Sequence, residues 1–469
     1  MRTEKENHIP TGPRTTKGVE TLLGDPKKAI LKLSTPMILG MFSQAVYNIA
    51  DGIWVSGLGA DELAAVGLFF PFFMVIISLG AGIGIGGGSA ASRRIGKGDK
   101  AGADNTAIHT FLVGGSISLI ISISILPFID TIFSYFSGNG NVGAMAAGYA
   151  KILFSGTVIM VFSHIAGALL RSEGDARRAM YGLMVGSILN IVLDPIFIYW
   201  LDMGVIGAAW ATIISLTFSS LLFCYWLFFK KDTYLIITLR DFNFNRKILA
   251  EILKVGVPSS LAQLSMSFAM IILNKVVIRA GGTDGIAVFT SGWRIVMLGV
   301  IPLIGISTGV VSVTGAAYGA GNREKLKSAF YFAVKFGLLI EVSIGVLILI
   351  FARPVAHIFT YSEGSERILE DLVTFLRIIC LLYPAVPMGM LTSAMFRGIG
   401  HGGRSLIVTI IRTIILQVPA AYFLGIILNM GLTGVWLGMV GGNILSLIVT
   451  FSWGIFTVNK VPLPRSKQN

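Results

Sequence analysis

Two carboxyl side chains, Asp51 and Asp194, each lie near or within a long stretch of mostly apolar residues. Asn190 precedes Asp194 by four residues, so in a helix the amide and the carboxylate share one face. Pro195 follows directly, and a proline removes a backbone donor and tends to kink a helix. A carboxylate, an amide and loosened backbone carbonyls can hold a proton or a small hard cation. The same residues can also serve only as a polar contact between two helices.

The composition places these residues in a membrane protein. The chain has 469 residues, of which 54% are hydrophobic and 13% charged, and its mean hydropathy is +0.79. Soluble domains carry about 25% charged residues. The hydropathy predicts an all-α integral membrane protein with twelve spans. Their approximate limits are 29–54, 62–88, 105–128, 145–169, 179–200, 206–229, 249–277, 285–314, 329–351, 369–394, 405–428 and 432–458.

The basic residues predict the orientation of the spans. The formal charge of +13 comes mostly from one set of alternate loops and from both tails. The residues concerned are Lys27, Lys28, Arg93, Arg94, Lys97, Lys100, Arg171, Arg177, Arg178, Lys230, Lys231, Arg240, Arg246, Lys247, Arg323, Lys325, Lys327, Arg397, Arg404, Lys460, Arg465 and Lys467. By the positive-inside rule both termini are cytoplasmic, and we expect a multi-pass protein of the cytoplasmic membrane with no nucleic-acid partner. The polar segment 1–28 shows no signal peptide.

The chain repeats itself. Four segments of the first half recur in the same order, and at a nearly constant offset, in the second half. The pairs are Leu33-Ser-Thr-Pro36 with Val255-Gly-Val-Pro258, Arg94-Ile-Gly96-Lys-Gly98-Asp99 with Ala317-Tyr-Gly319-Ala-Gly321-Asn322, Arg171-Ser-Glu-Gly174 with Arg397-Gly-Ile-Gly400, and Gly204-Val-Ile-Gly207 with Gly431-Leu-Thr-Gly434. Six spans in each half give both copies the same orientation, as in transporters whose substrate path lies between the halves.

The repeat predicts the domain organisation. We expect a cytoplasmic tail at 1–28, an N-lobe at 29–229, a cytoplasmic linker at 230–248, a C-lobe at 249–458 and a second cytoplasmic tail at 459–469. The pattern Gly82-Ile-Gly84-Ile-Gly86-Gly87 has the spacing of a dinucleotide-binding loop, but no strand precedes it, so close helix packing is the better interpretation.

The two halves differ in their buried acids. Asp51 aligns with Leu273 or its neighbour, and Asp194 aligns near Pro419 and Ala420, so both acids belong to the first half. Asp51, Asp194 and Thr212 all fall in the outer halves of their spans, and we expect them to meet at similar depth. In one desolvated pocket, burial and like charge disfavour ionisation of both carboxyl groups.

Several motifs in this order resemble the multidrug and toxic compound extrusion (MATE) family over nearly the whole chain. They are Pro36 followed by Tyr47-Asn48-Ile-Ala-Asp51, Arg171-Ser-Glu173-Gly174-Asp175, Asn190-Ile-Val-Leu-Asp194-Pro195, Gly204-Val-Ile-Gly207-Ala-Ala and the two Gly-x-Gly-(Asp/Asn) loops. The chain is most similar to the archaeal and DinF-like branch, which keeps its acidic pair in the N-terminal lobe. The acid of the NorM type in the seventh span is missing from residues 264–270.

The resemblance implies an antiporter with two six-helix lobes that exports cationic, drug-like compounds in exchange for H⁺ or Na⁺. Asp51, Asn190, Asp194 and Thr212 match the family's N-lobe cation or proton site, where Na⁺ is the metal considered. Tyr47 and Tyr149 match the polar network around it, and Pro36 matches the proline at a helix bend. We expect no cofactor beyond the coupling ion, a lipid bilayer as environment and a monomer.

Other charged groups are less informative. Arg171, Glu173 and Asp175 lie at a helix boundary, where we expect charge pairs and helix-end contacts. Glu341 and Arg412 lie inside predicted spans without an assigned partner.

Three other functions stay open at this stage. A flippase for lipid-linked sugars or lipids belongs to the same superfamily, but we expect it to carry a cationic central cavity. An enzyme is disfavoured because the spans contain no metal cluster or nucleophile–base set, and Cys224 and Cys380 suggest no disulfide. A channel is disfavoured by the asymmetry of the buried acids.

Overall fold

The computed structural model describes residues 15–137, 140–230, 232–238, 240, 242–360 and 366–464. Within these ranges the chain forms helices joined by short turns and loops, with no strand. The tail residues 1–14 and the basic residues Lys231, Arg465 and Lys467 lie outside the described residues.

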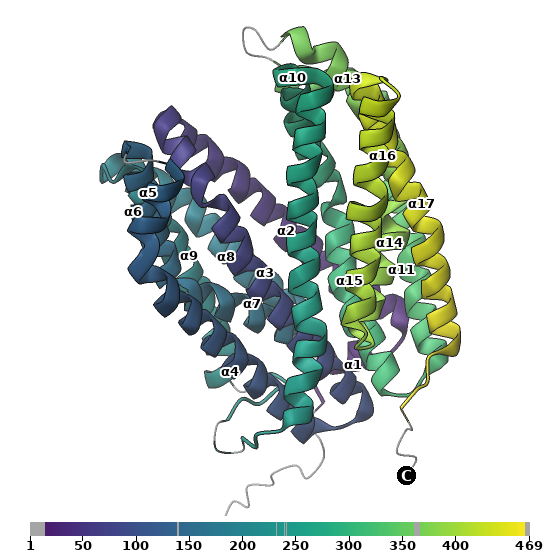
Figure 1. The fold of residues 1–469 in the computed structure, drawn as a ribbon. Coiled ribbons are helices and arrows are strands. Elements are labelled where there is room, and N and C mark those ends of the chain that lie inside the picture. Colours follow the sequence, from purple (N-terminus) through teal and green to yellow (C-terminus); the bar gives the residue numbers. More distant parts are fainter. Residues whose placement is uncertain are drawn as a thin grey trace, which may run out of the picture.

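The first half of the chain forms one group of helices, drawn in purple and blue in Figure 1. A short α1, Lys17–Leu23, precedes this group. The group comprises α2 Pro26–Ser56, α3 Ala60–Lys97, α4 Lys100–Ile125, η1 Leu126–Phe128, α5 Ile129–Ser137, α6 Asn141–Ser155, α7 Thr157–Ser172, α8 Ala176–Pro195, η2 Ile196–Trp200, α9 Gly204–Cys224 and η3 Tyr225–Phe229. We call this group the N-lobe.

The second half forms the other group, the C-lobe, drawn in green and yellow. It comprises α10 Arg246–Gly319, α11 Arg323–Ile350, α12 Ala352–Phe359, η5 Glu366–Ile368, α13 Leu369–Ile379, η6 Cys380–Leu382, α14 Val386–Gly398, α15 Gly402–Ile410, η7 Ile411–Gln417, α16 Val418–Tyr422, η8 Phe423–Ile427 and α17 Gly431–Lys460.

Twelve membrane spans follow from the lengths of these helices. Nine helices of the described chain are long and apolar enough to cross a membrane, and two bent pairs raise the number to eleven. At 74 residues, α10 would be about 110 Å long if straight, far more than a bilayer of about 30 Å needs. Its backbone leaves helical geometry at Gly281 and Gly282, where Gly282 has a φ of 61°. The chain folds back there, so α10 supplies two spans and the prediction of twelve is confirmed.

Turn chemistry explains one of the repeated motifs. Gly98 ends α3 with a left-handed φ of 75°, and Asp99 then caps α4 by accepting from the Gly102 amide at 3.0 Å. In the other half Gly321 has a φ of 70°, and Asn322 caps α11. A glycine that stops one helix and an Asp or Asn that starts the next produce a tight turn in both lobes.

The two lobes also match elsewhere in their backbones. Asp202 and Asn429, which occupy matching positions of the repeat, are the two non-glycine residues of the described chain with positive φ, at 52° and 53°. A π-helical segment ends just before each of them. The bent pair α6 and α7 turns by 49°, and the pair ending in α14 turns by 51°. The fold is therefore two pseudo-symmetric lobes, as the repeat predicts.

The lobes join along a seam near the end that carries the basic loops and the described parts of both tails. We call it the basic end, and the opposite end the far end. An added Cβ at Gly96 would lie 2.0 Å from the Ala316 carbonyl oxygen, and one at Gly319 would lie 1.9 Å from that of Arg93. Gly96 matches Gly319 in the repeat, and Arg93 matches Ala316, so each contact is the counterpart of the other. The seam is therefore related to itself by a pseudo-two-fold axis. Farther along, Gly82 and Gly86 approach the backbone around Gly256 equally closely, which is the close helix packing that their spacing favours.

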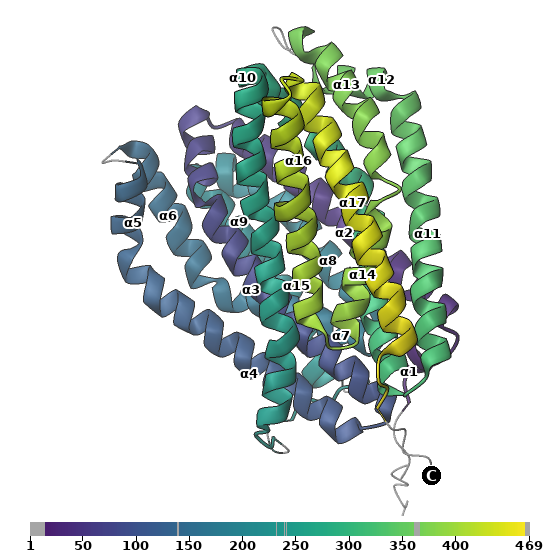
Figure 2. The ribbon, with the colours of Figure 1, turned by 45° about the vertical axis from the view of Figure 1, so that its right-hand side comes forward.

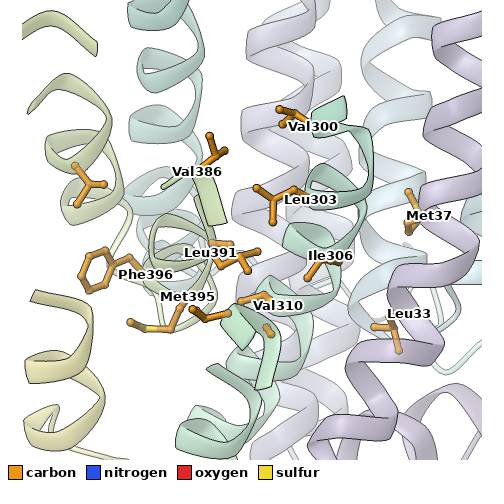
Figure 3. Close-up of a cluster of buried hydrophobic side chains, with 14 of the residues drawn as sticks. Leu33, Met37, Val300, Leu303, Ile306, Val310, Val386, Leu391, Met395 and Phe396 are labelled. Atoms are coloured by element: carbon orange, nitrogen blue, oxygen red, sulfur yellow. The ribbon is translucent and has the colours of Figure 1, made fainter. Parts of the chain in front are cut away.

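A buried apolar cluster continues from the N-lobe into the C-lobe across this seam. Figure 3 shows part of it, with side chains from α2, α10 and α14: Leu33, Met37, Val300, Leu303, Ile306, Val310, Val386, Leu391, Met395 and Phe396. In Figures 1 and 2 the two lobes lie against each other near the basic end and diverge toward the far end. The molecule is thus closed at its basic end.

The side-chain contacts at the boundary between α7 and α8 agree only in part with the predicted charge pairs. Asp175 caps α8 and pairs with Arg178 at 3.4 Å, as a helix-end contact should. Glu173 is 1% exposed and instead accepts a hydrogen bond from the Leu235 amide at 2.8 Å. Arg171 forms no ion pair within the described residues. The expected pairing is wrong for Glu173 because the loop 232–238 folds back and supplies a backbone donor, and it is wrong for Arg171, which has no carboxylate partner within the described residues.

Candidate cation site

The two N-lobe acids lie on α2 and α8, and these helices contact each other at the far end through η2. Asp51 lies on the last turns of α2, and Asp194 is the penultimate residue of α8, just before the π-helical η2. The Tyr199 hydroxyl of η2 donates to the Trp54 carbonyl at 2.5 Å, and the two rings meet edge to face. The π-helical turn after Pro195 thus turns Tyr199 onto α2 and holds the ends of the two helices together.

The carboxyl groups of Asp51 and Asp194 lie within hydrogen-bonding contact of each other. Asp194 is fully buried and Asn190 is 2% exposed. With its amide nitrogen toward Asp194, Asn190 donates to Oδ2 at 3.0 Å and accepts from the Thr212 amide at 3.3 Å. The structure thus brings together the four residues selected from the sequence for a cation or proton site.

This arrangement suits one positive charge. Two buried carboxylates in contact repel each other strongly unless a proton or a cation lies between them. Asp51 Oδ1 is buried and has no hydrogen-bond partner within the described chain. A buried polar atom of this kind requires a function or a ligand to explain it. Carboxylate, amide and hydroxyl oxygens at one point form a donor set that a hard monovalent cation can also use.

Aromatic groups close the site on one side. The Tyr47 and Tyr149 side chains interact electrostatically with both carboxyl groups. Tyr149 is 7% exposed and packs edge to face on Phe69, with centroids 5.4 Å apart. Phe69 belongs to a set of buried rings that includes Phe133 and Phe154. The tyrosines therefore place polar hydroxyls beside the acids while their rings extend the apolar wall.

Pro36 is not part of this cluster. It lies inside α2, which runs as one uninterrupted helix from Pro26 to Ser56. Fifteen residues separate it from Asp51, or about 22 Å along the axis. Its surroundings belong to the seam, since Gly305 and Gly309 of the C-lobe lie against Ile38 and Ser34.

The described part of the C-lobe has no counterpart to the acid pair. Leu273 is buried and apolar, and the repeat matches Asp194 with Pro419 and Ala420, which are also not acidic. The one buried acid of the described C-lobe, Glu341, is 0% exposed, and neither of its oxygens has a hydrogen-bond partner. It interacts electrostatically with Tyr383, whose hydroxyl is also buried and has no hydrogen-bond partner in the part of the chain that the structure describes.

Arg412 lies inside the C-lobe, between α14 and α17. A Cβ at Gly389 would lie 3.9 Å from its Nη1 and 4.0 Å from the Thr450 hydroxyl. The guanidinium forms no ion pair within the described residues. Glu341 and Arg412 therefore form no ion pair with each other or with another group of the described chain.

Ion pairs across the seam were not found from the sequence. Glu251 at the start of α10 pairs with Arg94 at 2.8 Å and lies 3.6 Å from Arg93. Ser89 donates to the carbonyls of Arg397 and Gly398, at 2.5 and 3.1 Å. The run of small residues before Arg93 was the available signal, since it allows helices to approach closely, but it does not say which charges meet.

The fold and the site together indicate the class of membrane protein to which the chain belongs. Twelve spans in two pseudo-symmetric lobes, closed together at one end and bearing polar groups within the bilayer, are the architecture of a secondary transporter.

The chain belongs to the MatE family, whose model matches residues 36–196 and 258–423. It is 26% identical over 427 residues to "Multidrug export protein MepA" of Staphylococcus aureus (strain NCTC 8325 / PS 47), covering 90% of this chain and 92% of the relative.

Two solved structures are more similar still. "Outward-facing conformation of a multidrug resistance MATE family transporter of the MOP superfamily" has 53% identity and a TM-score of 0.93, covering 95% of this chain and 99% of that chain. "Reverse polarity of binding pocket suggests different function of a MOP superfamily transporter from Pyrococcus furiosus Vc1 (DSM3638)" has 53% identity and a TM-score of 0.92, covering 96% and 100%. The chain is accordingly a membrane transporter and not an enzyme.

Proposed function

We propose that this protein is an antiporter that exports cationic, amphipathic compounds from the cell in exchange for H⁺ or Na⁺. The observation that carries the proposal is the contact between the carboxyl group of Asp194, which is fully buried, and that of Asp51, which is partly buried. In this proposal the acid pair binds the coupling ion, with Asn190 and Thr212 completing its polar surroundings. Tyr47 and Tyr149 support the pair, and Pro36 acts on the shape of α2 from the seam.

The coupling follows from competition for two states of the N-lobe. An unoccupied acid pair is negative and attracts an organic cation, whereas a bound H⁺ or Na⁺ cancels that attraction. The ion and the exported compound then favour different states, so binding of one promotes release of the other. An inward ion gradient thereby drives export.

The orientation belongs to the same proposal. We place the basic end, with both termini, in the cytoplasm and the protein in the plasma membrane, because the basic residues concentrate in the loops of that end. The lobes diverge toward the far end (Figure 1), and in this proposal that end faces the outside. The similarity to a multidrug export protein supports a drug-like substrate. A monomer and the DinF-like branch remain predictions from the sequence.

The test is transport of a fluorescent cationic dye in proteoliposomes, under an imposed H⁺ gradient or an imposed Na⁺ gradient. Wild type should export the dye under at least one gradient, and Asp194→Asn should not. Asp202→Asn is the matched control, because Asp202 is exposed and its φ of 52° suits asparagine. Normal transport by Asp194→Asn, or loss in both variants, would contradict the coupling site.

One observation favours a second candidate, the export of an anionic lipid-linked compound. Arg412 lies within the C-lobe without an ion pair among the described residues, and such a cation suits a phosphate-bearing substrate. The similar structure described by the words "Reverse polarity of binding pocket" supports keeping this candidate. It predicts that wild type moves no dye under either gradient but transfers a fluorescent lipid pyrophosphate, and that Arg412→Gln does not.

A further inference from the structure

A cavity of about 340 Å³ opens at the basic end, on the line where the two lobes meet. Arg93, Arg94 and Lys97 line it from the end of α3, and Glu251 and Lys254 line it from the start of α10. The loop between α14 and α15 forms another wall, at residues 399–401. By volume it has room for about ten waters, enough for a phosphate group and part of its hydration shell. It lies at the opposite end of the molecule from the acid pair.

The charge of this cavity is unbalanced. Its walls carry four cationic side chains against two carboxylates, those of Asp99 and Glu251. Glu251 is shared by Arg93 and Arg94, and Asp99 is engaged in capping α4. Lys97 and Lys254 are exposed and form no ion pair within the described residues. Two lysines, one from each lobe, are therefore free to bind an anion.

His401 lines the same cavity and lies close to its cationic side chains. Its Nδ1 is buried without a hydrogen-bond partner in the described chain. Burial lowers the pKa of His401 to about 4, and the neighbouring cations Arg404, Lys254 and Arg93 act in the same direction. A neutral imidazole keeps one donor and one acceptor, so it can donate to an anion without adding a charge to the site.

The backbone keeps Arg93 in place. Its Nη1 donates to the Ser89 hydroxyl at 2.6 Å and to the Gly398 carbonyl at 3.3 Å. Gly400 has a φ of 86°, and a Cβ there would lie 3.1 Å from the guanidinium carbon. The guanidinium is thus held against the C-lobe loop, which is a built wall rather than a free surface side chain.

We propose that this cavity binds a phosphate-bearing anion that bridges the two lobes and favours the arrangement in which they are closed at the basic end. The lysines from the two lobes supply the free charge, and the arginines supply fixed donors. Guanidinium and ammonium groups are the usual partners of phosphate. Because α3 lines one side and α10 the other, the walls separate when the lobes part at this end. An anion that binds only the closed arrangement then stabilises it by mass action.

The same chemistry has two sources, a lipid headgroup and a soluble phosphate. Basic pockets between helices at a membrane surface bind anionic headgroups, so both sources are tested. The first arm measures the melting temperature of the full chain in neutral detergent against inorganic phosphate at constant ionic strength. The second compares nanodiscs of phosphatidylcholine with and without added phosphatidylglycerol.

The test variant is Lys97→Gln with Lys254→Gln, which removes the free charges and leaves the Glu251 ion pairs intact. The matched control is Lys17→Gln with Lys32→Gln. Those two lysines are exposed, do not line the cavity and form no ion pair in the described chain, so the net charge changes equally. We expect a loss of at least tenfold in affinity in the test variant and little change in the control, since each lost charge-assisted contact is worth about tenfold.

A conformational measurement completes the test. Spin labels at Leu201 and Leu428, both exposed and at matching positions of the two lobes, report the opening at the far end. The anion should increase the population with the longer distance in wild type and in the control variant, but not in the test variant. A response to inorganic phosphate assigns a soluble ligand, and a response confined to phosphatidylglycerol assigns a headgroup. No response in either arm, or equal responses in the test and control variants, would overturn the proposal.

Discussion

The N-lobe and the C-lobe share their turns but not their buried charges. Asp202 in one lobe and Asn429 in the other adopt the same left-handed conformation after a π-helical segment. By contrast, the N-lobe holds two carboxyl groups in contact, the buried Asp194 and the partly buried Asp51, whereas the described C-lobe has Glu341 as its one buried acid. The shared features lie where the backbone turns or where the lobes touch. The difference lies in helix interiors, where a side chain can change without altering the path of the chain.

The two kinds of feature serve two functions, the packing of the lobes and the binding of a cation. The symmetric features let each lobe pack against the other in the same way, which a rocking transporter requires. The asymmetric charges give one lobe the ability to bind a cation. Substitutions at symmetric positions should therefore have equal effects in both lobes, and substitutions of buried charges should not.

The largest expected effect is on coupling. Asp51→Asn removes one member of the acid pair, and we expect gradient-driven dye export to fall by about 100-fold, or about 2.7 kcal/mol, because a neutral amide no longer attracts the coupling ion. Glu341→Gln removes the buried acid of the other lobe, and export should stay within about threefold. Initial rates in proteoliposomes give both values. Equal losses in the two variants would place the coupling ion in both lobes.

The next effect is on the seam. Gly96→Ala and Gly319→Ala each place a methyl group about 2 Å from a carbonyl oxygen of the other lobe. Overpacking of this kind costs about 1–3 kcal/mol, and the two costs should agree because the contacts are pseudo-symmetric. Thermal unfolding in detergent measures the loss of stability, and the distance between spin labels on the two lobes shows whether the seam has opened. Gly115→Ala is the control, since no described atom beyond its own helix turn lies within 4 Å of its added Cβ and alanine favours a helix by about 0.5–1 kcal/mol. Unequal costs at the two seam glycines would show that the seam is not symmetric in energy.

At the loop that follows α7 in the N-lobe and α14 in the C-lobe, the position of Glu173 should carry a pH effect in the N-lobe only. Burial raises the pKa of Glu173 to about 8 from 4.5, although its carboxylate accepts a bond from the Leu235 amide. The repeat places Ile399, which cannot titrate, at the matching position of the C-lobe.

The folded state then binds the proton more tightly than the unfolded state, so the contribution of Glu173 to stability is largest at low pH and is lost as pH rises toward 8. Between pH 6 and pH 8 the loss should be about 2 kcal/mol. The difference between wild type and Glu173→Gln, measured by denaturation at both pH values, isolates it. A difference that does not change with pH would mean that Glu173 is ionised in the folded protein.

The smallest expected effect is the change in the free energy of unfolding when a buried acid is replaced by an apolar residue. Neither oxygen of Glu341 has a hydrogen-bond partner among the described residues, so Glu341→Met should stabilise the fold by about 1 kcal/mol. Asp194→Leu should instead destabilise it by about 1–3 kcal/mol, because the amide of Asn190 loses its acceptor. Melting temperatures of the two variants decide the matter. A stabilised Asp194→Leu would show that the acid pair makes no structural contribution.

The sequence predicted the spans well because the hydropathy of one span is a local property of consecutive residues. It also selected Asp51, Asn190, Asp194 and Thr212, since a polar group in an apolar run is visible without a structure. It did not predict that Glu173 would bind a loop backbone rather than a cation. It also missed the pairing of Glu251 with Arg93 and Arg94, because those residues are far apart in the chain and every basic loop offers alternatives.

The sequence by itself determined the membrane class, the number of spans, the internal repeat and the restriction of the acid pair to one half. Each of these follows from hydropathy, spacing or the identity of a residue within its own helix. Only the tertiary structure decided that Asp51 and Asp194 touch and that Pro36 lies at the seam rather than beside them. It alone placed the cationic cavity between the lobes. These features depend on how distant helices cross, and that is set by the packing of small residues and turns over the whole chain.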